Sequence, residues 1–120
     1  MDNETKERLK SLEMVGLAEC TLYPDHRHVI TAKKLVVDYL RSNELVLMCA
    51  GWMTDVFTEK QAPGWRPNYR ADDSYTWNES IAYYLDKYDA ELPPVFLAHI
   101  YNEIGVEERR TSAGGGLRGA

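Results

Sequence analysis

Residues 23–28 (YPDHRH) form the stretch of the sequence that is best suited to chemistry. His26 and His28 are two positions apart, so on a β-strand both imidazoles would lie on one face. With Asp25 they could begin the metal site of a small metal-dependent enzyme, but a zinc site needs three or four converging ligands. The only other histidine, His99, stands on a helix face that we expect to be exposed. The simpler interpretation is a polar turn between two strands, and we predict neither a metal ligand nor a cofactor.

Nucleophilic and phosphate-binding chemistry have weaker support. A catalytic cysteine needs an accessible, activated thiol, whereas the apolar neighbours of Cys49 indicate that it is buried. The only glycine cluster, residues 114–116, lacks the preceding strand and the lysine of a phosphate-binding loop. We therefore predict no catalytic residue.

Acidic side chains are concentrated in the third quarter of the chain, where only Lys87 opposes them. They are Asp72, Asp73, Glu79, Asp86, Asp89 and Glu91. The first interpretation is a solvated face, because adjacent carboxylates at a helix start interact favourably with the helix dipole. A partner-binding surface is the second interpretation. A catalytic pair is the third, and it would need burial to split the two pKa values.

Large aromatic residues stand beside this acidic group. An apolar anchor with a polar rim is typical of a protein-binding patch. We therefore predict a partner-binding surface made of Trp65, Tyr69, Asp72, Asp73 and Tyr75. The alternative is that the three rings fold back over the edge of the core.

The C-terminal part of the domain has the clearest pattern of secondary structure. Thr76 followed by Glu79 fits a capping box at a helix start. Apolar residues then recur at helical spacing up to Tyr88. Pro93 and Pro94 suit the first turn of a second helix, and Gly105 suits its end. The short link between them predicts an antiparallel helix pair.

The remaining elements are predicted from shorter patterns. Helices are expected over residues 3–13 and from Thr31 to Arg41, the latter burying Val36, Val37 and Leu40. Strands are expected over residues 14–23, 28–30 and 52–57 and, as a buried central strand, over 45–50. Residues 58–73 contain two prolines and a glycine without any period, which predicts a long loop.

Together these elements predict an α+β fold, in which a small, mostly antiparallel sheet packs against helices and the chain ends in the helix pair. Residues 1–105 are expected to form a single domain. Residues 106–120 are polar and rich in glycine, which predicts a flexible tail.

Charge and composition narrow the classes of partner. The chain has 19 acidic and 14 basic residues, a net charge of −5, which opposes binding to nucleic acids and to anionic membranes and favours a basic protein partner. The N-terminus is too charged for a signal peptide, and the longest apolar stretch, residues 45–53, is too short to span a bilayer. Cys20 and Cys49 are expected to be free thiols, so a cytoplasmic protein is predicted.

Residues 45–102 resemble a pattern found among small, uncharacterised bacterial proteins of the immunity-protein type. An apolar strand ends in an Asp-Val-Phe-like sequence, here WMTDVF at 52–57. An Asp-rich, Trp-containing segment follows after a variable loop, here DDSYTW at 72–77. The pattern closes with Tyr83-Tyr84, Leu92-Pro93 and Phe96.

Immunity proteins neutralise toxins in interbacterial competition. The resemblance therefore implies an inhibitory protein whose partner is a toxin or another enzyme with a basic surface. Two alternatives stay open, namely the metal-dependent enzyme using Asp25, His26 and His28 and a structural homodimer with an aromatic interface.

Overall fold

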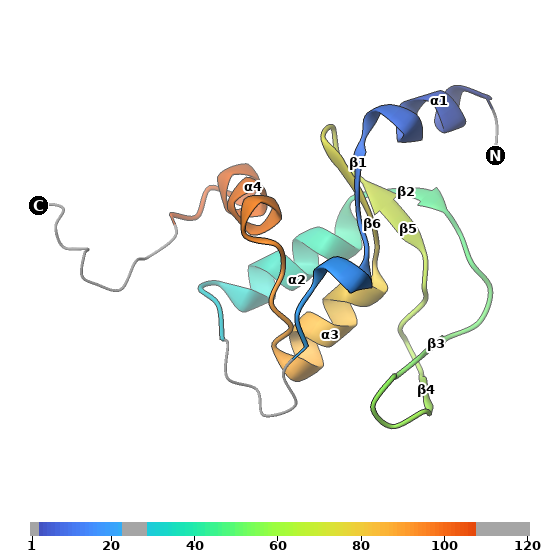
Figure 1. The fold of residues 1–120 in the computed structure, drawn as a ribbon, viewed down its shortest axis with the longest axis vertical. Coiled ribbons are helices and arrows are strands. Elements are labelled where there is room, and N and C mark those ends of the chain that lie inside the picture. The colour runs from blue at the N-terminus through green and yellow to red at the C-terminus, as the bar shows by residue number, and fades with distance from the viewer. Residues whose placement is uncertain (1–2, 23–28, 108–120) are drawn as a thin grey trace, which may run out of the picture.

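The computed structural model describes residues 3–22 and 29–107 and shows the predicted α+β fold (Figure 1). The helices are α1 (Asn3–Ser11), the short 3-10 helix η1 (Leu17–Glu19), α2 (Lys33–Ser42), α3 (Ser80–Tyr88) and α4 (Pro94–Ile104). The strands are β1 (Glu13–Val15), β2 (Glu44–Leu47), β3 (Met53–Thr54), β4 (Gln61–Ala62), β5 (Tyr69–Ala71) and β6 (Tyr75–Asn78). The predicted polar turn at 23–28 and most of the predicted tail lie outside the described residues.

Four strands form the main sheet in the order β1-β6-β5-β2, and β3 and β4 form a separate hairpin. Strand β1 is parallel to β6, while the other neighbours are antiparallel, as the prediction of a mostly antiparallel sheet requires. The register aligns residues in rows across the strands. One row is Met14, Thr76, Ala71 and Glu44, and the next is Val15, Trp77, Arg70 and Leu45.

Helices cover one face of this sheet. Trp77 is fully buried, and its indole Nε1 donates a hydrogen bond to the carbonyl oxygen of Leu40 in α2 over 2.9 Å. The predicted inner face of α2, Val36, Val37 and Leu40, is buried against the same core. Because alternate residues of a strand point to opposite faces, Thr76 and Asn78, which flank Trp77 in β6, point to the face that the helices leave uncovered.

The capping box predicted at Thr76 and Glu79 is wrong, because residues 75–78 form strand β6 and α3 begins at Ser80. Tyr75, Thr76 and Trp77 are aromatic or β-branched, which suits a pleated, buried strand. The Asp72 carboxylate accepts the backbone N–H of Ser74 and of Tyr75 and closes a tight turn to β5. This turn makes a β-hairpin where the helix was expected to begin.

Two further predictions in the middle of the chain are wrong. Residues 45–50 are not a buried central strand, since β2 is the end strand of the sheet and Leu45 is 41% exposed. The loop predicted at 58–73 contains β4 and the central strand β5. A run of apolar residues looks the same in sequence whether it faces a core or the solvent, so its length alone could not place it.

The boundaries of the N-terminal elements differ from their predicted positions by only a few residues. Thr31 does not cap α2; Ala32 occupies that position with a left-handed backbone, φ 54°. Strand β1 ends at Val15, because the chain turns at Gly16 into η1, where the Glu19 carboxylate accepts the Gly16 N–H. Val29 and Ile30 lie outside any strand.

Both predicted C-terminal helices are present, although α3 begins later than the pattern predicted. Helix α4 starts at Pro94, and Gly105 ends it with a φ of 73°, a conformation that glycine adopts at low cost. Both α3 and α4 lie against α2, and each contacts α2 more extensively than it contacts the other.

Candidate functional site

Two of the three predicted surface rings belong to the core. Tyr75 is only 9% exposed and packs on Phe96, with ring centroids 4.9 Å apart. Trp65 is half-buried between the Arg41 guanidinium, 3.9 Å above its ring, and Tyr83. These two rings follow the alternative interpretation, in which aromatic side chains fold back over the edge of the core.

Asp72 is a structural carboxylate that joins the β5–β6 turn to two helices. One carboxylate oxygen accepts hydrogen bonds from the Tyr39 hydroxyl at 2.5 Å and faces Nε2 of His99 at 2.7 Å. Burial raises the pKa of Asp72, but the hydrogen bonds from Tyr39, Ser74, His99 and Tyr75 lower it further, so it lies below its ordinary value. His99 is therefore half-buried and engaged with Asp72, contrary to the exposed position predicted for it.

The acidic stretch does not form a single solvated face. Glu79 is buried and pairs with the Arg70 guanidinium at 2.6 Å. Asp89 is also buried and pairs with the Lys33 ammonium at 2.6 Å. Of the predicted patch, Asp73 is exposed in the turn, Tyr75 is buried, and the other three residues are half-buried: Trp65, Tyr69 and Asp72.

Asp55 is a second structural carboxylate, which the sequence did not reveal. It is 3% exposed and accepts hydrogen bonds from the hydroxyls of Tyr83 and Tyr88 and from the backbone N–H groups of Phe57 and Thr58. Burial raises its pKa, and these donors lower it below the ordinary value. Because its oxygens are occupied by donors that hold the β3–β4 hairpin, we assign Asp55 a structural role.

The described residues offer little for metal or thiol chemistry. No group of three or more His, Cys, Asp or Glu side chains within residues 3–22 and 29–107 could hold a metal ion. Burial, followed by the nearby Glu19 charge, raises the pKa of the free Cys20 thiol to about 12, which opposes nucleophilic activation. The metal site suggested for Asp25, His26 and His28 lies outside the described residues and stays a prediction. Across the described part of the chain, every helix is too short or too polar to cross a membrane.

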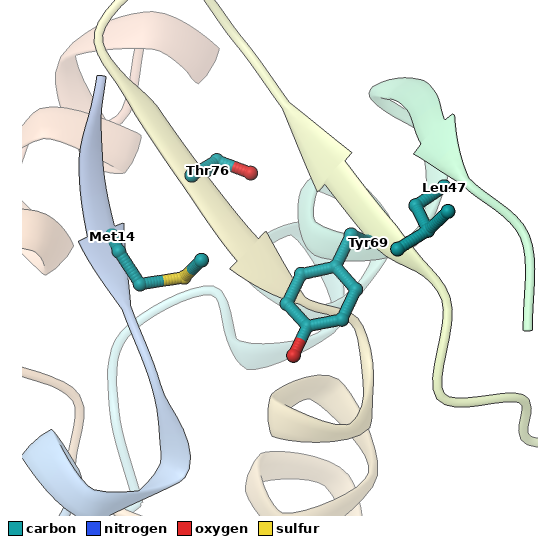
Figure 2. A pocket seen from close by; sticks show the side chains of 4 residues that line it. All are labelled: Met14, Leu47, Tyr69 and Thr76. Carbon is teal, nitrogen blue, oxygen red and sulfur yellow. The ribbon is translucent and has the colours of Figure 1, made fainter. Parts of the chain in front are cut away.

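A hollow lies on the uncovered face of the main sheet. Met14, Leu47, Tyr69 and Thr76 line it, one from each strand, and its volume is about 280 Å³ (Figure 2). Thr76 forms a buried floor, whereas Met14 is 54% exposed at the wall. We call these four residues the hollow.

The neighbouring edge of the sheet is also apolar. Strand β2 pairs with β5 on one side and is the last of the described strands on the other. Four large side chains along it and the segment that follows are at least 38% exposed: Leu45, Leu47, Met48 and Trp52. The Arg66 guanidinium lies 4.4 Å above the Trp52 ring and holds it at the surface. We call these four residues the apolar edge.

The apolar edge and the hollow share Leu47, so they form one continuous surface. The sequence signal was the apolar run itself, which was assigned to the core. No protein-family model, curated protein or solved structure matches this chain, and the geometry of its own residues therefore defines the candidate site.

Proposed function

We propose that this chain is a protein-binding protein and that its apolar edge is the surface that contacts the partner. The observation that carries the proposal is the exposure of the most apolar run in the sequence: Leu47, at the end of the edge strand β2, is 39% exposed, and Met48, which follows it, is 71% exposed. Proteins usually protect such an edge, because it can pair with other chains. Larger apolar patches on a protein surface commonly mark interaction sites.

The edge offers two kinds of contact. A strand from the partner could add to β2 through main-chain hydrogen bonds, the common mode by which exposed sheet edges bind extended segments. Leu47 and Met48 would supply apolar contacts beside it, and Trp52 would supply an aromatic anchor of the type enriched at binding hot spots. The register irregularity between Leu45 and Leu47 limits uncontrolled pairing, because a bulge twists an edge away from a flat template.

Within this proposal the protein is an inhibitor of the immunity-protein type in the bacterial cytoplasm. The net charge of −5 suits a toxin or other enzyme with a basic surface. The free state of Cys20 and Cys49 favours a reducing compartment. The resemblance over residues 45–102 supports the same class, and it includes part of the apolar edge.

The test compares two substitutions that place the same charge on equally exposed positions. Met48→Lys alters the apolar edge, and Val95→Lys alters α4, where Val95 is 72% exposed. Tagged wild-type protein and both variants are used to capture partners from a lysate of the parent cells, with quantification by mass spectrometry. We expect Met48→Lys to weaken capture of a stoichiometric partner roughly tenfold, a loss of about 1.4 kcal/mol, and Val95→Lys to leave it unchanged. Equal capture by all three proteins would reject the apolar edge as the binding surface.

A structural homodimer is the second candidate, because an exposed edge strand can also pair with a second copy of itself. The mass measured by light scattering distinguishes a homodimer from a protein that binds a foreign partner. A monomeric mass favours a foreign partner. A mass of two chains that Met48→Lys returns to one would assign the apolar edge to self-association.

A further inference from the structure

We propose that the hollow receives one large apolar side chain of a protein partner, and that this partner carries lysine or arginine beside that side chain. The inference rests on the proposed function, because it names the chemistry of the partner that the adjoining apolar edge would bind. It concerns the open face of the sheet, whereas the proposed function concerns the edge.

The register explains why the hollow is apolar. Met14 and Thr76 are paired in one row, and Tyr69 and Leu47 are paired in the next row on the same face. The Thr76 hydroxyl donates a hydrogen bond to the carbonyl oxygen of Arg70 over 3.0 Å, so it is engaged within the sheet. What remains to face an occupant is the methyl group of Thr76 between the side chains of Met14, Leu47 and Tyr69 (Figure 2).

The open shape of the hollow favours a side chain over a free small molecule. An apolar cavity of roughly 150 Å³ is large enough to hold benzene, so about 280 Å³ accepts a leucine, methionine or aromatic side chain. Sites for small molecules usually enclose most of the ligand. Here the wall residue Met14 is itself 54% exposed, so an occupant would be covered on one side only. A side chain that is anchored to a protein surface fits this geometry.

Charge around the hollow selects a basic partner. The only basic residue in the four strands of the main sheet is Arg70, whose guanidinium is paired with Glu79 at 2.6 Å and whose row partner, Trp77, faces the helices. Two exposed acidic residues border this face of the sheet. Glu44 lies in the same row as Met14 and Thr76, and Asp73 lies in the turn that leads into β6. A cationic side chain that flanks the apolar one would be attracted to these carboxylates.

The probe is a library of random dodecapeptides displayed on phage and selected on the intact, immobilised protein. We expect enriched peptides to share one large apolar residue with lysine or arginine within two positions of it. The strongest peptide is then synthesised with a fluorophore, and its affinity is measured by anisotropy. Met14→Lys is expected to weaken binding at least tenfold, and Val95→Lys is expected to leave it unchanged. Because Met14 is half exposed, the variant should fold, which circular dichroism verifies.

The outcomes separate this inference from the proposed function. Enriched peptides without basic residues, or an affinity that Met14→Lys does not change, would overturn the inference. If Met48→Lys weakens capture of the cellular partner while Met14→Lys does not, the proposed function holds and the inference fails. If the selection enriches no sequence and the protein is a dimer that Met14→Lys dissociates, the face belongs to a second copy and the inference is wrong.

Discussion

Asp55 and Asp72 are carboxylates that hold separate elements together by accepting hydrogen bonds. Asp72 connects the β5–β6 turn with Tyr39 of α2 and His99 of α4, and Asp55 connects the β3–β4 hairpin with Tyr83 and Tyr88 of α3. In both cases burial raises the pKa, and the donated hydrogen bonds lower it to below 3.8. A carboxyl group with a lowered pKa in the folded state stabilises the fold above its unfolded pKa, and this stability is lost as the pH falls through the folded pKa.

The free energy of unfolding should therefore fall as the pH drops below about 4. Asp72→Asn should be less stable than the wild type at neutral pH and should lose less stability on acidification, because one of the two titrating groups is gone. Urea unfolding at neutral and acidic pH measures both effects. Asp73→Asn, exposed in the same turn, serves as the control and should keep the full acid dependence. An Asp72→Asn variant with the same acid dependence as the wild type would show that Asp72 does not titrate as described.

The sequence indicated the type of these residues but not their partners. Asp72 and Tyr75 were grouped as a surface because they are close in sequence to other acidic and aromatic residues. Their roles depend on Tyr39 and His99, which are 33 and 27 positions away from Asp72. Asp73 is the one fully exposed residue of the predicted patch, because it lies at the tip of the turn, whereas Tyr75 is buried in the core.

At the scale of elements, helices with a regular apolar repeat were predicted correctly, whereas a short segment whose pattern fits both a helix start and a strand was not. Helices α2 and α4 repeat apolar residues at helical spacing, and the predicted inner face of α2 is buried as expected. Of the stripe that the spacing predicts for α4, Phe96 and Ile100 are buried, while Leu97 and Ile104 are half-buried. Strand β6 was mistaken for a helix start, because Thr76 and Glu79 have the spacing of a capping box. Tertiary pairing with β5 and burial of Trp77 decided the outcome.

Glu79 would have a different role in each case: a capping residue at a helix start, or the ion-pair partner of Arg70. The substitution Glu79→Gln distinguishes the two roles. A capping box accepts glutamine in place of glutamate, so the substitution would be nearly neutral at a helix start. In the structure Glu79 pairs with Arg70, whose side chain is 18% exposed, and the substitution leaves this guanidinium without its carboxylate. We therefore expect Glu79→Gln to lower the free energy of unfolding by about 2–3 kcal/mol. Urea denaturation measures the change, and a loss below about 0.5 kcal/mol would contradict the buried ion pair.

At the scale of the whole molecule, negative charge and the apolar surface act on different steps of binding. The net charge of −5 accelerates encounter with a basic partner, whereas apolar contacts slow dissociation. Reversing exposed acidic residues should therefore lower the association rate and leave the dissociation rate nearly unchanged.

The variant Glu13→Lys with Asp73→Lys tests this expectation. Both residues are exposed, so the double substitution spares the hydrogen bonds of Asp72. Surface plasmon resonance with the captured partner should show an association rate several-fold lower than that of the wild type at low salt, with the difference disappearing at high salt. Asp38→Lys with Asp86→Lys, two exposed positions on α2 and α3, is a control with the same change in net charge at another surface. Association rates that are equally slow for both variants would mean that the end of the sheet has no special part in steering.

The central proposal is that a protein partner covers strand β2. Hydrogen exchange, followed by mass spectrometry on the free protein and on its complex with the partner captured by the wild type, tests it most directly. Added main-chain hydrogen bonds should slow exchange in the segment 44–52, while exchange in α4 stays the same. Protection that appears on α4 or α2 with no change in the segment 44–52 would contradict the proposal.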